Sequence, residues 1–272
     1  VAETTIILAD IADPRYTVAA RVHALRKYTK RMRALFRLIR GAFPDFREAN
    51  RALRDTARLV SSHRDARVMA DLVEHLGRTR NLDPVVDWYD YRAEAAERLA
   101  GEKFLVIAER LQDMLVRLDR WDFSHVGLDD VMHGFRKTFS IVLDQGTLVS
   151  DTSDSHEAHE WRKCCKDHWY HLRLLYDALP KRERARVDDY DRLCDLLGSV
   201  HDRDVLQVQL ATLPEFLAET RQVAAIARAA RRERKAMQTE AVTLAGSLLD
   251  DEAKKLATKL RRNWKRRLKP GR

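Results

Sequence analysis

Residues that break secondary structure are scarce in this sequence, whose 272 residues include only 9 glycines and 6 prolines. An all-β protein needs a turn signal about every 8–12 residues, so this scarcity favours helices. The sequence also lacks any apolar run near the ~20 residues of a membrane span, and its opening residues lack the basic start and cleavage site of a signal peptide. We therefore expect an all-α protein that is soluble and cytoplasmic, with no membrane partner.

Cysteines and the motifs of common enzymes are few or missing as well. The 3 cysteines are an odd number, and Cys164 and Cys165 are adjacent, which suits neither a disulfide framework nor a CxxC metal site. The sequence contains no P-loop, no G-x-S-x-G motif and no alternating acidic strand of the kind that a metal-dependent triphosphatase needs. These absences predict no catalytic residue, no metal and no cofactor.

Positive charge is concentrated in a few segments. Lys and Arg number 51 against 42 Asp and Glu, which gives a net charge of +9. Residues 254–272 hold ten Lys and Arg and no acidic residue, so the rest of the chain is close to neutral. A neutral body with local basic segments indicates that those segments have a role in binding anions.

The strongest basic segment, Arg21 to Arg40, contains eight basic residues and no acidic one. Wound as a helix at about 100° per residue, it places basic side chains in a stripe about 120° wide. This first stripe consists of His23, Arg26, Lys27, Lys30, Arg33 and Arg37. The apolar residues expected on the opposite face are Leu25, Met32, Leu35, Phe36 and Ile39. Like charges four residues apart repel by about 0.2–0.5 kcal/mol, so a bound anion would stabilise this helix, although a solvated basic face has the same pattern.

The same pattern occurs again 136 residues farther along the chain. The second stripe consists of His159, Arg162, Lys163, Lys166 and Arg173, which align with His23, Arg26, Lys27, Lys30 and Arg37. The identities fall mostly on the charged side, whereas the apolar side matches only in kind. An internal duplication that retains the cationic positions favours ligand binding over a merely solvated face.

The repeat predicts two tandem helical-bundle units of about four helices each, residues 1–148 and residues 149–272, with the polar stretch 146–157 as the linker. The second unit carries the basic C-terminal tail. Internal pseudo-two-fold symmetry would bring both stripes to one central basic groove.

Local signals predict where helices begin and end inside these units. We expect a break at Pro44 or Pro180, and then a turn in which Asp65 or Asp202 caps the next helix. Another helix should start at Pro84, with a break near residue 101 before it ends at about residue 121, and a core helix should cover residues 127–149.

Two copies of H-x-x-R-K-x-x-K, each followed by a segment similar to L-G-x-x-R-D-x-D-V, resemble the conserved-histidine α-helical domain, or CHAD domain. The resemblance extends over about residues 18–267. It implies a helical bundle with internal two-fold symmetry that binds inorganic polyphosphate in a basic central channel lined by both stripes. It also implies association with polyphosphate granules or with enzymes of polyphosphate metabolism.

The second copy departs from the pattern, because Asp167 stands where the first copy has Arg31, and Trp169 where it has Arg33. We therefore expect the second stripe to bind more weakly.

Histidine begins each stripe, and a protonated imidazole donates two hydrogen bonds, so we favour phosphate contact over a packing or capping role for His23 and His159. Polyphosphate requires repeated cationic groups and no stacking platform. We expect the nearest aromatic, Tyr28, on the apolar side with its hydroxyl in water.

Two alternatives stay open. The tail Lys259 to Arg272 would bind any polyanion, nucleic acid included, by counterion release. His201 and Asp202 form the pair typical of HD-type metal-dependent phosphohydrolases. Further candidate metal ligands are His156, His159, His168 and His171. The repeat aligns His201 with Arg64, which is no metal ligand, and this disfavours the phosphohydrolase.

Overall fold

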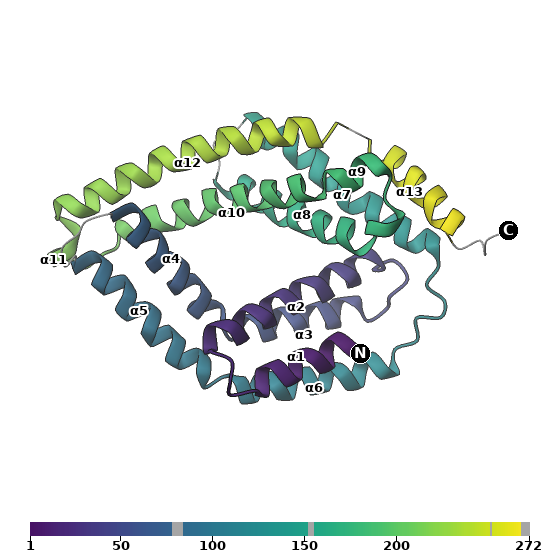
Figure 1. Ribbon diagram of the computed structural model, residues 1–272, viewed down its shortest axis with the longest axis horizontal. Coiled ribbons are helices and arrows are strands. Elements are labelled where there is room, and N and C mark those ends of the chain that lie inside the picture. Colours follow the sequence, from purple (N-terminus) through teal and green to yellow (C-terminus); the bar gives the residue numbers. More distant parts are fainter. Residues whose placement is uncertain (78–83, 152–154, 251, 268–272) are drawn as a thin grey trace. The chain divides into compact units, whose positions relative to one another are not determined.

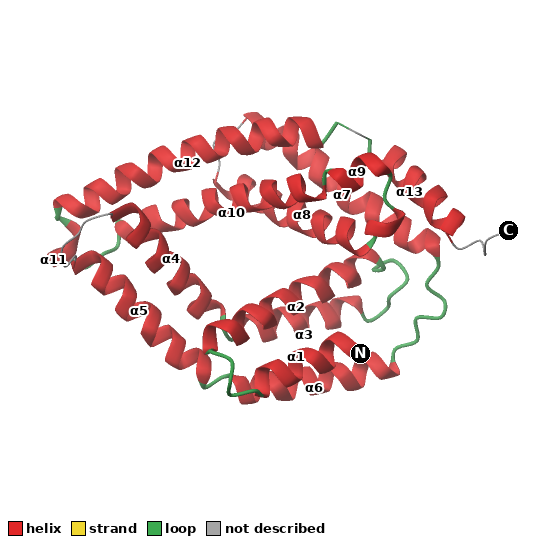
Figure 2. Ribbon diagram, viewed as in Figure 1, coloured by secondary structure: helices red, strands yellow, loops and turns green. Residues whose placement is uncertain are grey.

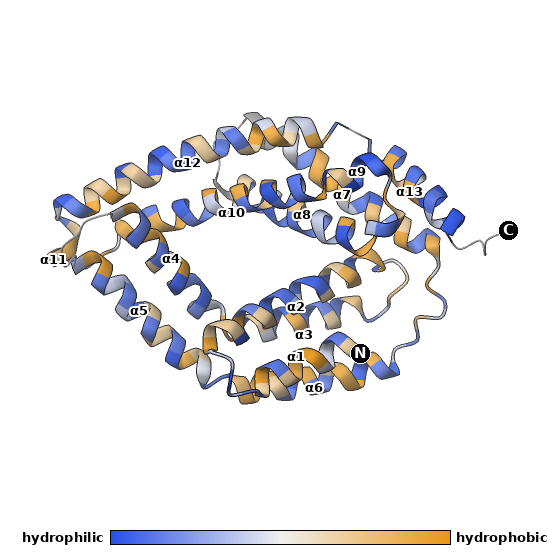
Figure 3. Cartoon of the chain, viewed as in Figure 1, coloured by the Kyte–Doolittle hydropathy of each residue, from blue (hydrophilic) through white to orange (hydrophobic). Residues whose placement is uncertain are grey.

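The computed structural model describes residues 1–77, 84–151, 155–250 and 252–267, apart from the side chains of residues 148–156. Within these ranges the chain forms thirteen α-helices, one short 3-10 helix and no strand (Figure 2). The prediction of an all-α protein is confirmed. Hydrophilic and hydrophobic residues alternate along the helices, as in amphipathic helices that pack by one side (Figure 3). None of the described helices combines the length and the apolar composition that crossing a membrane requires.

The chain divides into two compact units, each built from segments that are distant in sequence. Unit 1 contains residues 1–33, 45–123 and 206–230, and unit 2 contains residues 34–44, 124–205 and 231–272. The helices that contribute to both units are α2 (Val18–Leu38), α10 (Val187–Leu210) and α12 (Arg221–Leu248). The predicted boundary near residue 148 rests on repetition in the sequence and not on contacts, so it stays a prediction, as does the two-fold symmetry.

Unit 1 contains the larger part of α2 and six described helices that belong to this unit alone. These are α1 (Ala2–Ala12), α3 (Phe46–Arg58), α4 (Ser61–Gly77), α5 (Pro84–Gly101), α6 (Phe104–Arg120) and α11 (Glu215–Ala218). Helix α1 packs against α6, and α4 packs against α5 (Figure 1). Leu25 of α2, Leu53 of α3 and Ile107 of α6 are almost completely buried. Each of these helices therefore buries one apolar side, as its sequence pattern predicts.

Unit 2 contains the longest part of α10 and of α12, and the last residues of α2. Its other helices are α7 (Leu128–Asp151), α8 (Ser155–Leu174), the 3-10 helix η1 (Tyr176–Ala178), α9 (Lys181–Ala185) and α13 (Ala253–Arg267). Helix α7 packs along α8 and α13 (Figure 1). Its residues Phe135, Phe139 and Val142 are buried in a core shared with α8, α10, α12 and α13. The predicted core helix over residues 127–149 is thereby confirmed.

A glycine allows the end of α2 to approach α7 closely. A Cβ atom at Gly134 would lie 1.8 Å from the carbonyl oxygen of Leu38, which no side chain can tolerate without a backbone shift. Gly134 therefore sets the distance between α7 and the last turn of α2.

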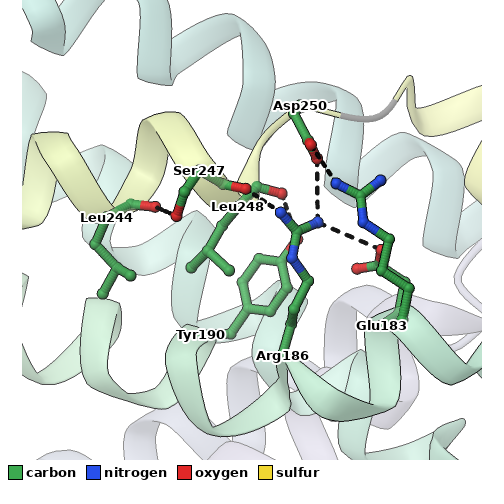
Figure 4. Close-up of polar contacts among 8 residues, drawn as sticks. Glu183, Arg186, Tyr190, Leu244, Ser247, Leu248 and Asp250 are labelled. Atoms are coloured by element: carbon green, nitrogen blue, oxygen red, sulfur yellow. Dashed lines mark hydrogen bonds and ion pairs between the residues drawn. The ribbon is translucent and has the colours of Figure 1, made fainter.

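A polar network joins the start of α10 to the end of α12 (Figure 4). The Arg186 guanidinium pairs with Asp250 at 3.1 Å and with Glu183 at 3.5 Å. Beside it, the hydroxyl of Tyr190 donates to the carbonyl oxygen of Leu248 across 3.0 Å. The side chain of Glu183 is only 3% exposed, so its charge depends on the neighbouring guanidinium.

Several predicted helix boundaries are confirmed. Pro44 and Pro180 both lie between helices, and α5 begins at Pro84. A break near residue 101 separates α5 from α6, which ends at Arg120.

The predicted turn with an aspartate cap is wrong in both copies, because Asp65 lies inside α4 and Asp202 inside α10. In the first copy the helices are separated earlier, at Leu59 and Val60, and in the second copy the helix continues without a break. Gly198 does not end α10, because one helical glycine costs only about 1 kcal/mol.

The predicted linker is also too long. Residues 146–151 belong to α7, and α8 begins at Ser155. With thirteen α-helices in the described chain, about four helices per unit was an underestimate.

Candidate anion-binding surface

Helix α2 carries the first stripe on the side opposite its buried residues. Leu25, Met32 and Phe36 are buried, as predicted. Leu35 is 36% exposed, so its placement on the apolar side was wrong. At about 100° per residue it lies roughly 80° from Leu25, at the border between the two faces. Ile39 lies just beyond the end of α2 and is half-buried.

The middle of the first stripe is open to solvent. His23, Lys27 and Lys30 are exposed, while Arg26 and Arg33 are half-buried. Across the described residues, neither His23 nor Lys27 has an ion-pair or hydrogen-bond partner on its side chain. Within the exposed part of this stripe, the charge of Lys27 is therefore not compensated by any described residue of the protein.

Basic residues of α2 outside the stripe have partners in unit 1. Arg31 pairs with Glu3 at 2.5 Å, and the guanidinium of Arg21 lies 4.4 Å from the centre of the Phe104 ring. These contacts hold α2 against α1 and α6. The basic residues of α2 thus fall into two groups, one that holds the helix against its neighbours and one that is exposed to solvent.

The last residue of the first stripe is neutralised in unit 2. Arg37 donates to Asp167 of α8 across 2.8 Å. Burial, and next the charge of Arg37, lower the pKa of the neighbouring Arg40. Asp167 is one of the positions at which the second copy departs from the first, and it reduces the charge of the stripe where α2 ends.

The second stripe lies along α8 and has acidic and aromatic partners. Lys163 pairs with Glu160 at 2.6 Å. Lys166 pairs with Asp191 at 3.1 Å and with Asp195 at 3.7 Å. These carboxylates compete with any external anion, so α8 offers less uncompensated charge than α2.

Trp169, the second departure from the first copy, also engages two cations of this stripe. The ammonium group of Lys166 lies 4.1 Å from the centre of its ring, and the guanidinium of Arg173 lies 4.8 Å away. The tryptophan itself is buried, which orients both cations along α8.

Helices α8 and α10 run antiparallel where the second stripe lies. His159 faces His201, Arg162 lies 3.7 Å from the Cβ position of Gly198, and Lys166 faces Asp195. Residues later in α8 thus contact residues earlier in α10. A Cβ atom at position 198 would make only an ordinary van der Waals contact with Arg162, so this pairing does not require a glycine there.

The predicted ligand His159 packs against a second histidine, His201, with ring centres 4.2 Å apart and the ring planes tilted by 32°. Burial, and next the nearby His201, lower the pKa of His159 to about 4, so its imidazole is neutral at pH 7. Protonation of this imidazole beside a bound phosphate stays a prediction. The role of His201 was missed because the repeat aligns it with Arg64.

The other histidines considered as metal ligands face the core. His168 is buried with its ring stacked 4.3 Å from Phe139, and the buried His171 bonds to a backbone carbonyl. The side chain of His156 lies outside the described residues. In the described part of the chain, no three His, Cys, Asp or Glu side chains form a group that could hold a metal ion.

Tyr28 lies on the apolar side of α2, as expected, but its hydroxyl is not in water. It bonds to the hydroxyl of Thr4 across 2.8 Å, and both residues are buried. Burial raises the pKa of Tyr28 to about 12. Tyr28 therefore positions α1 on α2 and offers no surface for stacking bases.

The basic tail is helical as far as Arg267, and residues 268–272 lie outside the described chain. Leu256 and Leu260 of α13 are buried in the unit 2 core. Arg261 pairs with Asp129 of α7 at 2.6 Å. The described part of the tail is therefore a packed helix with one basic side and not an extended arm.

Comparison with known protein families gives a match over most of the chain. The family model of the CHAD domain matches residues 12–211, which include both stripes. No curated protein matches the chain. The matched region ends before α12 and α13, so it is shorter than the expected extent to residue 267.

Proposed function

The chain belongs to the CHAD domain family, whose known role is to bind polyphosphate, and we propose that it binds inorganic polyphosphate without catalysis. The observation that supports this most is the exposed first stripe, in which the charge of Lys27 has no partner among the described residues. Polyphosphate has about one charge per unit and no bases, so a row of cations at helical spacing suits it.

In this proposal the two stripes contribute unequally to the binding of polyphosphate. The first stripe supplies the principal contacts, with His23, Lys27 and Lys30 exposed on α2. The second stripe contributes less, because Lys163 and Lys166 must leave Glu160 and Asp191 before they bind phosphate. A groove lined by both stripes stays a prediction. Such binding would tether the protein to polyphosphate granules in the cytoplasm.

Charge reversal on α2 tests the proposal directly. Lys27→Glu should weaken binding of long polyphosphate by roughly tenfold or more. The slope of log affinity against log salt concentration should become shallower by about one to two. The matched control is Lys103→Glu, an equally exposed position between α5 and α6 with the same change of charge. Equal losses in both variants would contradict binding at the first stripe.

The tail is the competing site for polyanions. Deleting the residues after Lys254 would remove Leu256 and Leu260 from the core, so deletion would confuse loss of folding with loss of binding. Reversing the exposed Arg262 and Lys265 to Glu leaves the buried side of α13 intact. If this variant loses binding while Lys27→Glu does not, the tail is the binding site. Single-stranded DNA of matched charge should compete poorly; equal competition would indicate a general polyanion binder.

A further inference from the structure

A pocket of about 240 Å³ lies between α7 and α13 in unit 2. Each helix lines it with four residues at spacings of three, four and seven. They are Asp129, Met132, His133 and Arg136 from α7, and Lys254, Ala257, Thr258 and Arg261 from α13. Met132 and Ala257 are buried, whereas the polar lining residues are exposed. The pocket is thus open to solvent and several times larger than the ~30 Å³ that one water occupies in the liquid.

The two ends of this pocket differ in charge. At one end Asp129 neutralises Arg261 through an ion pair of 2.6 Å. Arg136 lies seven residues later in α7 and Lys254 seven residues earlier in α13, so the helices run antiparallel and both cations line the other end. In the part of the chain that the structure describes, neither Arg136 nor Lys254 has an ion-pair partner.

Packing of the two helices does not require this cationic end. The contact between α7 and α13 buries Phe135, Leu256 and Leu260, so the apolar core holds the helices together. The hydroxyl of Thr258 donates to the carbonyl oxygen of Lys254 across 2.8 Å and is therefore not a donor to a ligand. Like charges beside each other at an apolar floor are unfavourable unless an anion or water compensates them.

We propose that this pocket is a second anion site, separate from both stripes, and that it binds a phosphoryl group through Arg136, Lys254 and His133. A guanidinium binds two phosphate oxygens at once, an ammonium group adds a point charge, and an imidazole donates one hydrogen bond. The ligand is an inorganic phosphate anion, either a free small phosphate or one segment of a longer chain. This site does not depend on the proposed function of the stripes.

Titration calorimetry of the full chain with tripolyphosphate, in about 50 mM salt, tests the site. Arg136→Glu should weaken binding at this site by about tenfold or more. The matched control is Lys137→Glu, the next residue on α7, which is exposed, has the same change of charge and does not line the pocket. The control should weaken binding much less than Arg136→Glu, since the side chain of Lys137 does not line the pocket and acts on a bound anion only through its charge. Equal effects of the two variants would overturn the proposal.

Two further measurements strengthen the test. Asp129→Asn removes the carboxylate that neutralises Arg261, so affinity for tripolyphosphate should rise several-fold; unchanged or weaker binding would overturn the assignment. Orthophosphate binding that Arg136→Glu abolishes would identify a free anion as the ligand. Binding seen only with long polyphosphate, and weakened by Arg136→Glu beyond Lys137→Glu, would identify a chain segment. If Lys27→Glu weakens binding and Arg136→Glu does not, the anion binds at the first stripe and the proposed pocket site is overturned.

Discussion

The Nε2 atom of His171 on α8 donates a hydrogen bond to the carbonyl oxygen of Ala34 on α2, across 2.9 Å. Burial lowers the pKa of His171 to about 4, so the ring that makes this bond is neutral. The contact lies within unit 2 and joins the last turn of α2 to α8. It shows that a histidine next to the basic stripes serves packing and not ligand binding.

Replacing this histidine should weaken the attachment of α2. His171→Phe keeps a flat ring but removes the donor, and we expect the free energy of unfolding to fall by about 1–2 kcal/mol at pH 7. Urea denaturation followed by circular dichroism measures the change. A variant as stable as the unmodified protein would show that Ala34 does not need this partner.

Stability should fall as the solution becomes acidic. Burial lowers the pKa of His168 to about 3 and that of His171 to about 4, against 6.5 for an ordinary histidine. The unfolded chain therefore takes up these protons near pH 6.5 and the folded chain does not, so stability is constant above pH 6.5 and declines below it. The decline is at most about 1.4 kcal/mol per pH unit for each histidine.

His168→Phe isolates one of the two groups. Neither ring nitrogen of His168 has a hydrogen-bond partner among the described residues, and the ring stacks on Phe139, so phenylalanine fits the chemistry of the site. Urea denaturation at several pH values between 7 and 4.5 should show that the free energy of unfolding of this variant falls less steeply as the pH is lowered. The difference in slope should correspond to about one proton. An unchanged slope would contradict the assignment.

The close approach at Gly134 predicts a large effect of one methyl group. Gly134→Ala places its Cβ 1.8 Å from the Leu38 carbonyl oxygen, and we expect a loss of about 3 kcal/mol or more as α7 and α2 separate. The matched control is Gly246→Ala in α12, where nothing lies within 4 Å and alanine should stabilise the helix by about 0.5–1 kcal/mol. Thermal denaturation of both variants measures the contrast, and similar values would contradict it.

The carboxylates beside the second stripe should limit polyphosphate binding. Asp191→Asn removes the nearer of the two carboxylates that pair with Lys166, at 3.1 Å, and leaves Asp195 at 3.7 Å. Affinity for long polyphosphate should therefore rise by roughly fivefold at most, because unit charges 4 Å apart in water interact by about 1 kcal/mol. Asp144→Asn, an exposed position on α7, is the control for net charge. If both variants bind equally, the second stripe takes no part.

The sequence alone predicted the helical class and the exposed side of α2, because helical periodicity is a local property. Leu25 and Phe36 are buried and Lys27 is exposed, as the 100° spacing requires. The same reasoning failed at Asp202, since an aspartate caps a helix only where the chain already turns, and α10 continues through that position.

Contacts between distant segments were beyond sequence reasoning. Nothing in the local pattern shows that Asp191 neutralises Lys166 or that His201 packs against His159, because both depend on the antiparallel register of α8 and α10. The repeat even concealed the second contact, since it aligned His201 with an arginine. The repeat therefore predicted the spacing of the basic residues but not the residues that each of them contacts.

The interleaving of segments in the two compact units has a consequence for fragments of the protein. A chain cut at residue 148 would give two pieces, and neither would contain all the segments of unit 1 or of unit 2. Each piece would expose apolar helix faces that the other normally covers. Co-expression of both pieces should therefore restore soluble protein by complementation, whereas either piece produced alone should aggregate.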